Sequence, residues 1–144
     1  MEVERVILVN EKDEAIGLME KMEAHRKAEL HRAFSVFIFN DEGQMLIHQR
    51  AKSKYHSGGL WTNACCSHPR ENETIEEAAH RRLVEEMGFD TEVQKKFNFI
   101  YRAELDHGLT EHELDHVLVG IFNDEPTPNP EEVEDWKYVD MVDL

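Results

Sequence analysis

Cysteine is scarce in this 144-residue chain, which contains only two cysteines, Cys65 and Cys66. They are neighbours, and adjacent cysteines rarely form an unstrained disulfide. The sequence therefore excludes a small scaffold held together by disulfides, and we expect both thiols to be reduced.

Long apolar runs and positive charge are also lacking. No stretch reaches the roughly 18 uninterrupted apolar residues of a membrane span, and the acidic start MEVERV does not resemble a secretory signal. We therefore expect a cytoplasmic protein with no membrane partner. Because 16 Lys and Arg stand against 31 Asp and Glu, the net charge is −15, which disfavours nucleic acid as a partner. A small anionic ligand would need the few basic residues to gather at one place.

The length and the 40% hydrophobic content fit one domain spanning residues 1–144. Residues 18–30 are rich in helix formers and are expected to be partly helical. Three prolines between residues 123 and 131 indicate a loop. Short β-rich apolar runs predict strands at 5–10, 34–39, 45–47, 97–103 and 117–122.

A helix from Thr74 to about Met87 is the best-defined local element. Thr74 can cap it, with Glu77 as the capping-box partner and Gly88 as the stop. On a helical wheel one apolar face, which should meet the sheet, contains Ile75, Ala78, Ala79, Leu83 and Met87.

Arg82 and Glu86 fall within this apolar arc, four residues apart. A carboxylate and a guanidinium are costly to bury without partners. Two explanations stay open: they form a structural ion pair, or they line a ligand site.

The segment around this helix resembles the Nudix signature, a loop and helix of the pattern G-x5-E-x7-R-E-U-x-E-E-x-G-U, where U is a bulky aliphatic residue. Two positions depart from it: Ser67 replaces the first glycine, and Arg82 replaces a glutamate that Nudix hydrolases use around magnesium. The resemblance implies an α/β (α+β) fold with a mixed β-sheet sandwiched between helices. The residues that stand at motif positions are Glu73, Arg81, Leu83, Glu85, Glu86 and Gly88, with Phe89 at the last apolar one.

Residues 61–69, with the sequence WTNACCSHP, indicate one particular family within the Nudix superfamily. Together with EKMEAH, LHRAFSVFIFN, QRAKSK and YRA they resemble type I isopentenyl diphosphate isomerase over nearly the whole chain. That family usually continues into a further helical stretch carrying a tryptophan, which nothing in residues 1–144 matches. The resemblance implies isomerisation of isopentenyl diphosphate to dimethylallyl diphosphate.

Within this resemblance Cys66 and Glu113 match the catalytic acid and base, and Tyr101 assists them. Shifting an alkene requires a proton to be added at one carbon and another to be removed from a second carbon, so two groups must flank the hydrocarbon. We therefore expect Cys66 and Glu113 on opposite sides of a pocket with an apolar floor and a basic mouth. For Tyr101, packing as an aromatic on a strand stays an alternative.

The resemblance also implies two divalent metals. Imidazoles with carboxylates suit zinc, manganese or iron better than calcium, and the matching residues are His25, His31, His68, Glu111 and Glu113. Glu111 and Glu113, two apart, would share one face of a strand. Magnesium would bridge the substrate diphosphate with help from Glu86 and the carbonyl of Cys66.

The anion-binding residues that match the family are Lys21, Arg50, Lys54 and Arg82. They would bind a small-molecule prenyl diphosphate in a protein that is a monomer or a weak homodimer.

Three rival functions remain. The sequence HELDH at 112–116 spells the H-E-x-x-H motif of zinc proteases, but its β-rich surroundings argue against the required helix. A Nudix pyrophosphohydrolase would share the fold and magnesium, and Arg82 argues against it. A shortened or engineered derivative with weak or no turnover is the third possibility.

Overall fold

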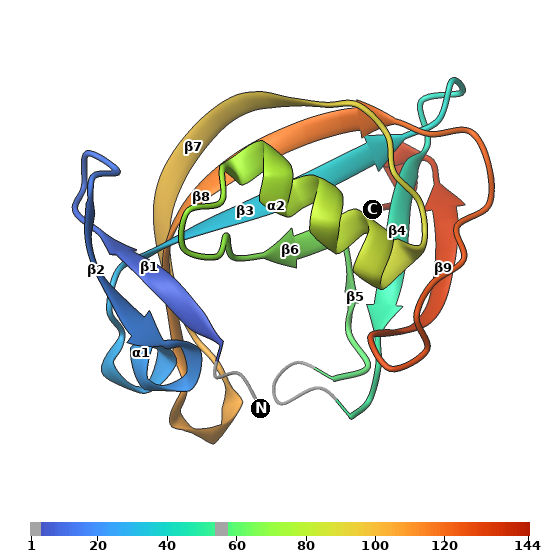
Figure 1. Ribbon diagram of the computed structural model, residues 1–144. Coiled ribbons are helices and arrows are strands. Elements are labelled where there is room, and N and C mark those ends of the chain that lie inside the picture. The colour runs from blue at the N-terminus through green and yellow to red at the C-terminus, as the bar shows by residue number, and fades with distance from the viewer. Residues whose placement is uncertain (1–3, 54–57) are drawn as a thin grey trace.

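The computed structural model describes residues 4–53 and 58–144, and within them the strands form one mixed sheet. Its central strand is β3 (His31–Phe39), which pairs in parallel with β8 (Thr110–Ile121) and antiparallel with its other neighbours. The α/β (α+β) prediction of a mixed sheet is therefore confirmed. The described α-helices are few, only α1 (Lys21–Lys27) and α2 (Ile75–Arg82) (Figure 1).

The remaining strands extend the sheet on both sides of this parallel pair. β7 (Val93–Glu104) follows β8 as a long outer strand, and β1 (Arg5–Val9) and β2 (Ala15–Glu20) form a hairpin beside the start of β3. The rest of the sheet comprises β4 (Met45–Arg50), β5 (Trp61–Thr62), β6 (Cys65–Ser67) and β9 (Val133–Val139).

The five predicted strand segments lie in strands and extend past the strand ends by at most one residue. The prediction that residues 18–30 are partly helical is confirmed, with Leu18 and Glu20 in β2 and the helix beginning at Lys21. β2 has no apolar alternation, and its residues are half-buried or exposed. Its pairing with β1, a tertiary contact, decides its conformation.

The helix that begins after Thr74 has the predicted capping box, in which Thr74 Oγ1 accepts from Glu77 N and Glu77 Oε1 accepts from Thr74 N. Its predicted apolar face is buried and packs on Phe34, Val36 and Ile38 of β3. From Leu83 to Met87 the α-helix widens into a π-helical turn, a feature common at functional sites.

Gly88 ends this turn at φ 72°, and a Cβ there would lie 2.0 Å from the carbonyl oxygen of Thr127. Only glycine fits this approach. The loop after β8 thus packs directly on the helix end and brings Glu132 toward Arg82.

Within the described residues, no helix is long and apolar enough to cross a membrane.

Candidate active site

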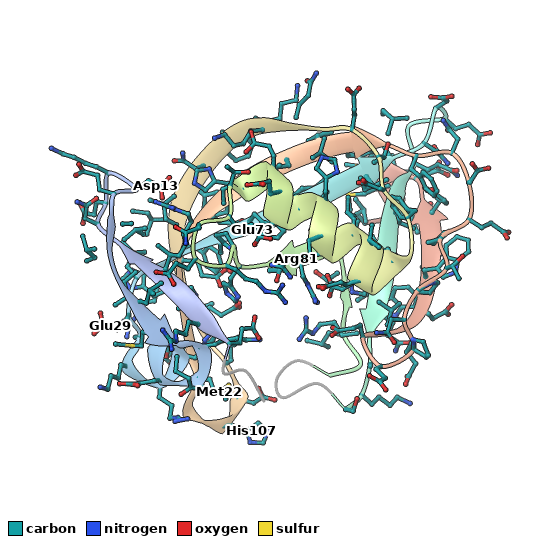
Figure 2. The ribbon with its side chains drawn as sticks, in the orientation of Figure 1. Asp13, Met22, Glu29, Glu73, Arg81 and His107 are labelled. Carbon is teal, nitrogen blue, oxygen red and sulfur yellow. The ribbon has the colours of Figure 1, made fainter. Side chains whose placement is uncertain are left out.

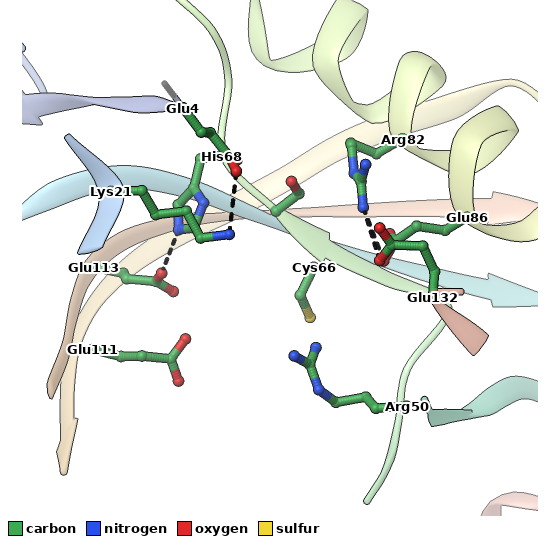
Figure 3. Close-up of a pocket in the computed structure, with 11 residues that line it drawn as sticks. Glu4, Lys21, Arg50, Cys66, His68, Arg82, Glu86, Glu111, Glu113 and Glu132 are labelled. Carbon is green, nitrogen blue, oxygen red and sulfur yellow. Dashed lines mark hydrogen bonds and ion pairs between the residues drawn. The ribbon is translucent and has the colours of Figure 1, made fainter. Parts of the chain in front are cut away.

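A cavity of about 270 Å³ opens on the side of β6 where Cys66 points away from α2 (Figure 3). Segments far apart in the sequence form it: the start of β1 and of α1, the end of β4, β6, the π-helical turn, β8 and the loop before β9. The described residues that line it are Glu4, Lys21, Arg50, Cys66, Ser67, His68, Arg82, Glu86, Glu111, Glu113 and Glu132.

Three imidazoles and one carboxylate converge beside this cavity. His25 from α1, His31 from β3, His68 after β6 and Glu113 from β8 each offer a ligand atom, and these atoms lie within 4.8 Å of one another. The parallel register sets His31 opposite Glu113. Glu113 Oε2 lies 3.2 Å from Nε2 of His31 and 2.9 Å from Nε2 of His68.

Backbone carbonyls orient two of these rings. Nδ1 of His25 lies 2.8 Å from the carbonyl oxygen of Lys21, and Nδ1 of His31 lies 2.9 Å from that of Glu29. Donation from Nδ1–H leaves Nε2 of a neutral imidazole with its lone pair. His31 Nε2 and the Glu113 carboxylate would then be two acceptors facing each other, an arrangement that a cation between them stabilises. The donor set fits a divalent metal ion.

Glu111 lies on the same face of β8 as Glu113, as the spacing predicted, and it lines the cavity. Its carboxylate is not one of the four ligands, from the three histidines and Glu113, whose atoms lie within 4.8 Å of one another in the described residues. Burial and the neighbouring charge of Glu113 raise the pKa of Glu111 to about 7.

Glu113 is buried and hydrogen-bonded on both carboxylate oxygens. Tyr101, its partner across the β7–β8 pair, donates its hydroxyl to Oε1. Burial acts to raise the pKa of Glu113, but the adjacent imidazoles of His31 and His68 outweigh it and hold that pKa well below its usual range. Burial and the Glu113 charge raise the pKa of Tyr101, so its hydroxyl stays protonated at neutral pH.

Cys66 presents its sulfur to the cavity from β6. Although the sulfur is open to the cavity, the surrounding protein removes enough water to raise the pKa of the thiol to about 12. The sulfur lies 3.1 Å from Asn63 Oδ1 and 3.6 Å from Ser35 Oγ. At neutral pH Cys66 is therefore a protonated thiol held among polar side chains.

Arg82 and Glu86 satisfy both explanations that the sequence left open. Arg82 Nη2 lies 3.2 Å from Glu86 Oε1, so they form an ion pair, and both side chains also line the cavity. Burial lowers the pKa of Arg82, but the Glu86 charge and the hydrogen bond to Glu85 outweigh it and raise that pKa, so Arg82 stays charged.

Arg81, at the signature position beside Arg82, ties the helix to the loop before it (Figure 2). Its guanidinium donates to both carboxylate oxygens of Glu73, at 2.8 and 3.0 Å, and to the backbone carbonyl of His68 at 3.4 Å. This bidentate pair fixes the loop that carries His68.

The predicted basic mouth is wrong for the described part of the cavity. Three of the four predicted anion-binding residues, Lys21, Arg50 and Arg82, line it, and Lys54 lies outside the described residues. Glu4 lies 3.3 Å from Lys21, and Glu132 lies 3.4 Å from Arg82. Among its described lining residues, five glutamates outnumber these three cations. No sequence pattern indicated Glu4 and Glu132, because only the fold brings them to the cavity.

The predicted apolar floor is also wrong, since the described lining residues are polar apart from the thiol of Cys66. An apolar groove lies next to the cavity instead, lined by Ser35, Phe37, Phe97, Phe99, Tyr101, Asp115 and Val117. Alternate residues of β8 share one face of the sheet. On this face the carboxylates of Glu111 and Glu113 come first, and the apolar side chain of Val117 follows farther along the strand. The apolar surface therefore adjoins the acidic cavity.

The HELDH segment lies in β8, which excludes the helical zinc-protease motif. On a strand, residues 112 and 116 are separated by roughly 13 Å. His112 Nδ1 lies 3.0 Å from the carbonyl oxygen of Ala28, and His116 Nε2 lies 2.8 Å from Asp13 Oδ2.

Comparison with known proteins agrees with this geometry. The family model described as NUDIX domain matches residues 29–144. The chain is 54% identical over 144 residues to the isopentenyl-diphosphate Delta-isomerase of Pectobacterium atrosepticum, covering all of this chain and 80% of that protein. The chain belongs to the isopentenyl-diphosphate Delta-isomerase family of the Nudix superfamily.

A second relative, isopentenyl-diphosphate Delta-isomerase 2 of Aromatoleum aromaticum, is 51% identical over 141 residues, which are 98% of this chain and 75% of the relative. Among solved structures, the DR0079 protein of Deinococcus radiodurans has a TM-score of 0.79 at 22% identity, covering 95% of this chain and 83% of that one. The MutT protein of Methanosarcina mazei has a TM-score of 0.67 at 16% identity and covers 79% of each chain. These two structures show the Nudix fold alone.

Proposed function

We propose that this member of the isomerase family interconverts isopentenyl and dimethylallyl diphosphate in isoprenoid biosynthesis. The observation that carries the proposal is that a protonated thiol, Cys66, and an ionised carboxylate, Glu113, line one cavity from different strands. The relatives whose names specify this reaction match the chain over almost its whole length.

The reaction needs one proton to be added at the terminal alkene carbon and one to be removed from the carbon two bonds away. Cys66 and Glu113 are the two groups that exchange these protons, one donating while the other accepts, with the roles exchanged in the reverse direction. The Tyr101 hydroxyl, hydrogen-bonded to Glu113, keeps that carboxylate oriented and so assists the proton transfer.

Two cations are part of the proposal. His25, His31, His68, Glu111 and Glu113 would hold zinc or manganese, and Glu86 with the carbonyl of Cys66 would hold magnesium at the substrate diphosphate. When bound, these ions supply the positive charge that the cavity needs to accept an anion. Without them the five glutamates among the described lining residues would repel a diphosphate.

Lys21, Arg50 and Arg82 are proposed to bind the diphosphate oxygens, together with Lys54. For Lys21 and Arg82 this means an exchange of partners, because each is paired with a glutamate in the structure. Arg82 can bridge Glu86 and the diphosphate with separate guanidinium nitrogens.

The physiological partner is proposed to be the small-molecule prenyl diphosphate. We infer a monomer or a weak homodimer in the cytoplasm, acting as a single domain over residues 1–144.

A labelling experiment tests the function. The metal-loaded protein is incubated with isopentenyl diphosphate in deuterated water, and the allylic product is examined for deuterium. Labelled dimethylallyl diphosphate, formed at least about 100-fold more slowly with Cys66→Ala, supports the proposal. No product above that control would show that the chain is an inactive derivative, and release of phosphate or diphosphate without isomerisation would make it a hydrolase.

A further inference from the structure

Asn63, in the turn between β5 and β6, has a side chain fixed by its amide group. Both hydrogens of Nδ2 are used: one is donated to the carbonyl oxygen of Val36 at 2.9 Å, the other to that of Cys65 at 3.0 Å. A flipped amide would set its oxygen against two carbonyl oxygens, so the hydrogen-bond pattern determines which end is Oδ1. Oδ1 therefore points away from these two strands.

The sulfur of Cys66 lies where Oδ1 points, 3.1 Å away. Thr62 Oγ1 also donates to this Oδ1, at 2.9 Å, but the two hydrogen bonds from Nδ2 already orient the amide. An amide oxygen has no hydrogen to give, so in this contact the thiol is the donor. The S–H bond is thereby directed at Asn63.

The second neighbour of the sulfur is also an acceptor. The Ser35 hydroxyl donates its one hydrogen to Asp115 Oδ2 at 2.7 Å, so the face of Oγ that lies 3.6 Å from Cys66 Sγ carries a lone pair. Ser35 stands opposite Cys66 in the β3–β6 pair and belongs to the same face of the sheet. Two acceptors, one in the turn before β6 and one on β3, thus surround one thiol hydrogen.

We propose that Asn63 is a positioning residue for the thiol of Cys66: it holds the sulfur at the cavity wall and the S–H bond toward Oδ1, with Ser35 as the weaker second acceptor. Proton exchange with a substrate carbon then needs only rotation about the Cβ–Sγ bond, and the sulfur itself need not move. Figure 3 shows the Cys66 side chain pointing into the cavity toward Arg50. The proposal rests on the proposed function for its effect on turnover, although the hydrogen bond itself does not.

The direct test is infrared spectroscopy of the metal-loaded protein, with Cys66→Ala subtracted to isolate the S–H stretching band of Cys66. A hydrogen-bonded thiol absorbs at lower wavenumber than a free one. We expect a lowered band in the unmodified protein, and a return toward the free-thiol position in Asn63→Ala. This measurement needs no substrate, so it stands even if isomerisation is not found. It also needs no folded Asn63 variant, because a free-thiol band in the unmodified protein would by itself overturn the proposal.

The kinetic test compares Asn63→Ala with Thr62→Val, which removes the other donor to Oδ1 but leaves the Asn63–Cys66 contact. For Asn63→Ala we expect kcat to fall by about 10- to 100-fold with KM nearly unchanged, because a misplaced reacting group affects turnover rather than diphosphate binding. Ser35→Ala should give a smaller fall in kcat. Thr62→Val should leave both the band and kcat close to those of the unmodified protein.

Equal losses in Thr62→Val and Asn63→Ala would show that Asn63 only stabilises the turn, and the proposal would be wrong. A normal kcat in folded, metal-loaded Asn63→Ala would also overturn it. Asn98→Ala, at an exposed position of β7, is the matched control for loss of an asparagine side chain.

Discussion

The two neighbouring cysteines of β6 have opposite surroundings. Cys65 is fully buried against the helix side, where its thiol donates to Glu86 Oε2 at 2.9 Å. Cys66 faces the cavity and contacts Asn63 and Ser35. One step along a strand turns a side chain to the other face of the sheet, so one cysteine serves packing and the other is available for chemistry.

The same division holds for the whole sheet. On the α2 side, Phe34, Val36 and Ile38 of β3 join the helix in the core. On the other side, Ser35 of β3 and Glu113 of β8 belong to the polar surface around the thiol. Substitutions on the cavity side should reduce activity, and substitutions on the α2 side should reduce stability.

Loss of the cavity-side thiol should have the largest effect. Cys66→Ala removes one of the two proton-transfer groups, which typically contribute about 10²- to 10⁴-fold, so we expect kcat to fall by that factor. Thermal unfolding should be nearly unchanged because the thiol faces the cavity. Turnover is measured by product formation from isopentenyl diphosphate. Activity near that of the unmodified protein would show that Cys66 takes no more part in the reaction than Cys65 does.

Loss of a buried imidazole should come next. His31→Ala removes a predicted metal ligand, so affinity for the transition metal should fall by more than about 100-fold, beyond what loss of a partner to a ligand costs. Metal content after dialysis, measured by mass spectrometry, checks this. His107→Ala, at an exposed position, is the control. Retention of stoichiometric metal in His31→Ala would remove His31 from the site.

The buried thiol should have a smaller effect, and on a different property. Cys65→Ala withdraws the S–H donor from Glu86 and should lower the free energy of unfolding by ~1–3 kcal/mol. Because Cys65 does not line the cavity, kcat of the folded protein should stay within about threefold. Denaturant unfolding and turnover are measured together. A fall in kcat as large as that of Cys66→Ala would assign the wrong cysteine to the reaction.

The smallest effect is expected at the cavity edge. Glu132→Gln removes a carboxylate that competes for Arg82, so inorganic diphosphate with magnesium should bind about two- to fivefold more tightly, as expected for a partly exposed ion pair. Calorimetric titration measures this. Glu131→Gln removes the same charge from an exposed neighbour and serves as control. Weaker binding in Glu132→Gln would indicate that this glutamate helps to hold the magnesium.

Local patterns were sufficient to predict the main elements. Apolar runs marked five of the nine described strands, and the Thr74 cap with Gly88 marked the helix, because these signals depend on backbone conformation within a few residues. The helical wheel of the segment after Thr74 also predicted that Arg82 and Glu86 would be charged residues on the buried face. It did not show the π-helical turn, in which packing on the sheet and the Thr127 contact at Gly88 determine the local geometry.

The sequence by itself determined the family, the alternation that separates Cys65 from Cys66, and which residue types could hold a metal. The tertiary structure decided which of them meet: His25, His31, His68 and Glu113 come from four segments and converge through strand register. It also decided that Glu4 and Glu132 enter the cavity and that Asn63 directs its oxygen at Cys66. The physical reason is that periodicity and capping act within a few residues, whereas a cavity depends on packing between segments distant in the chain.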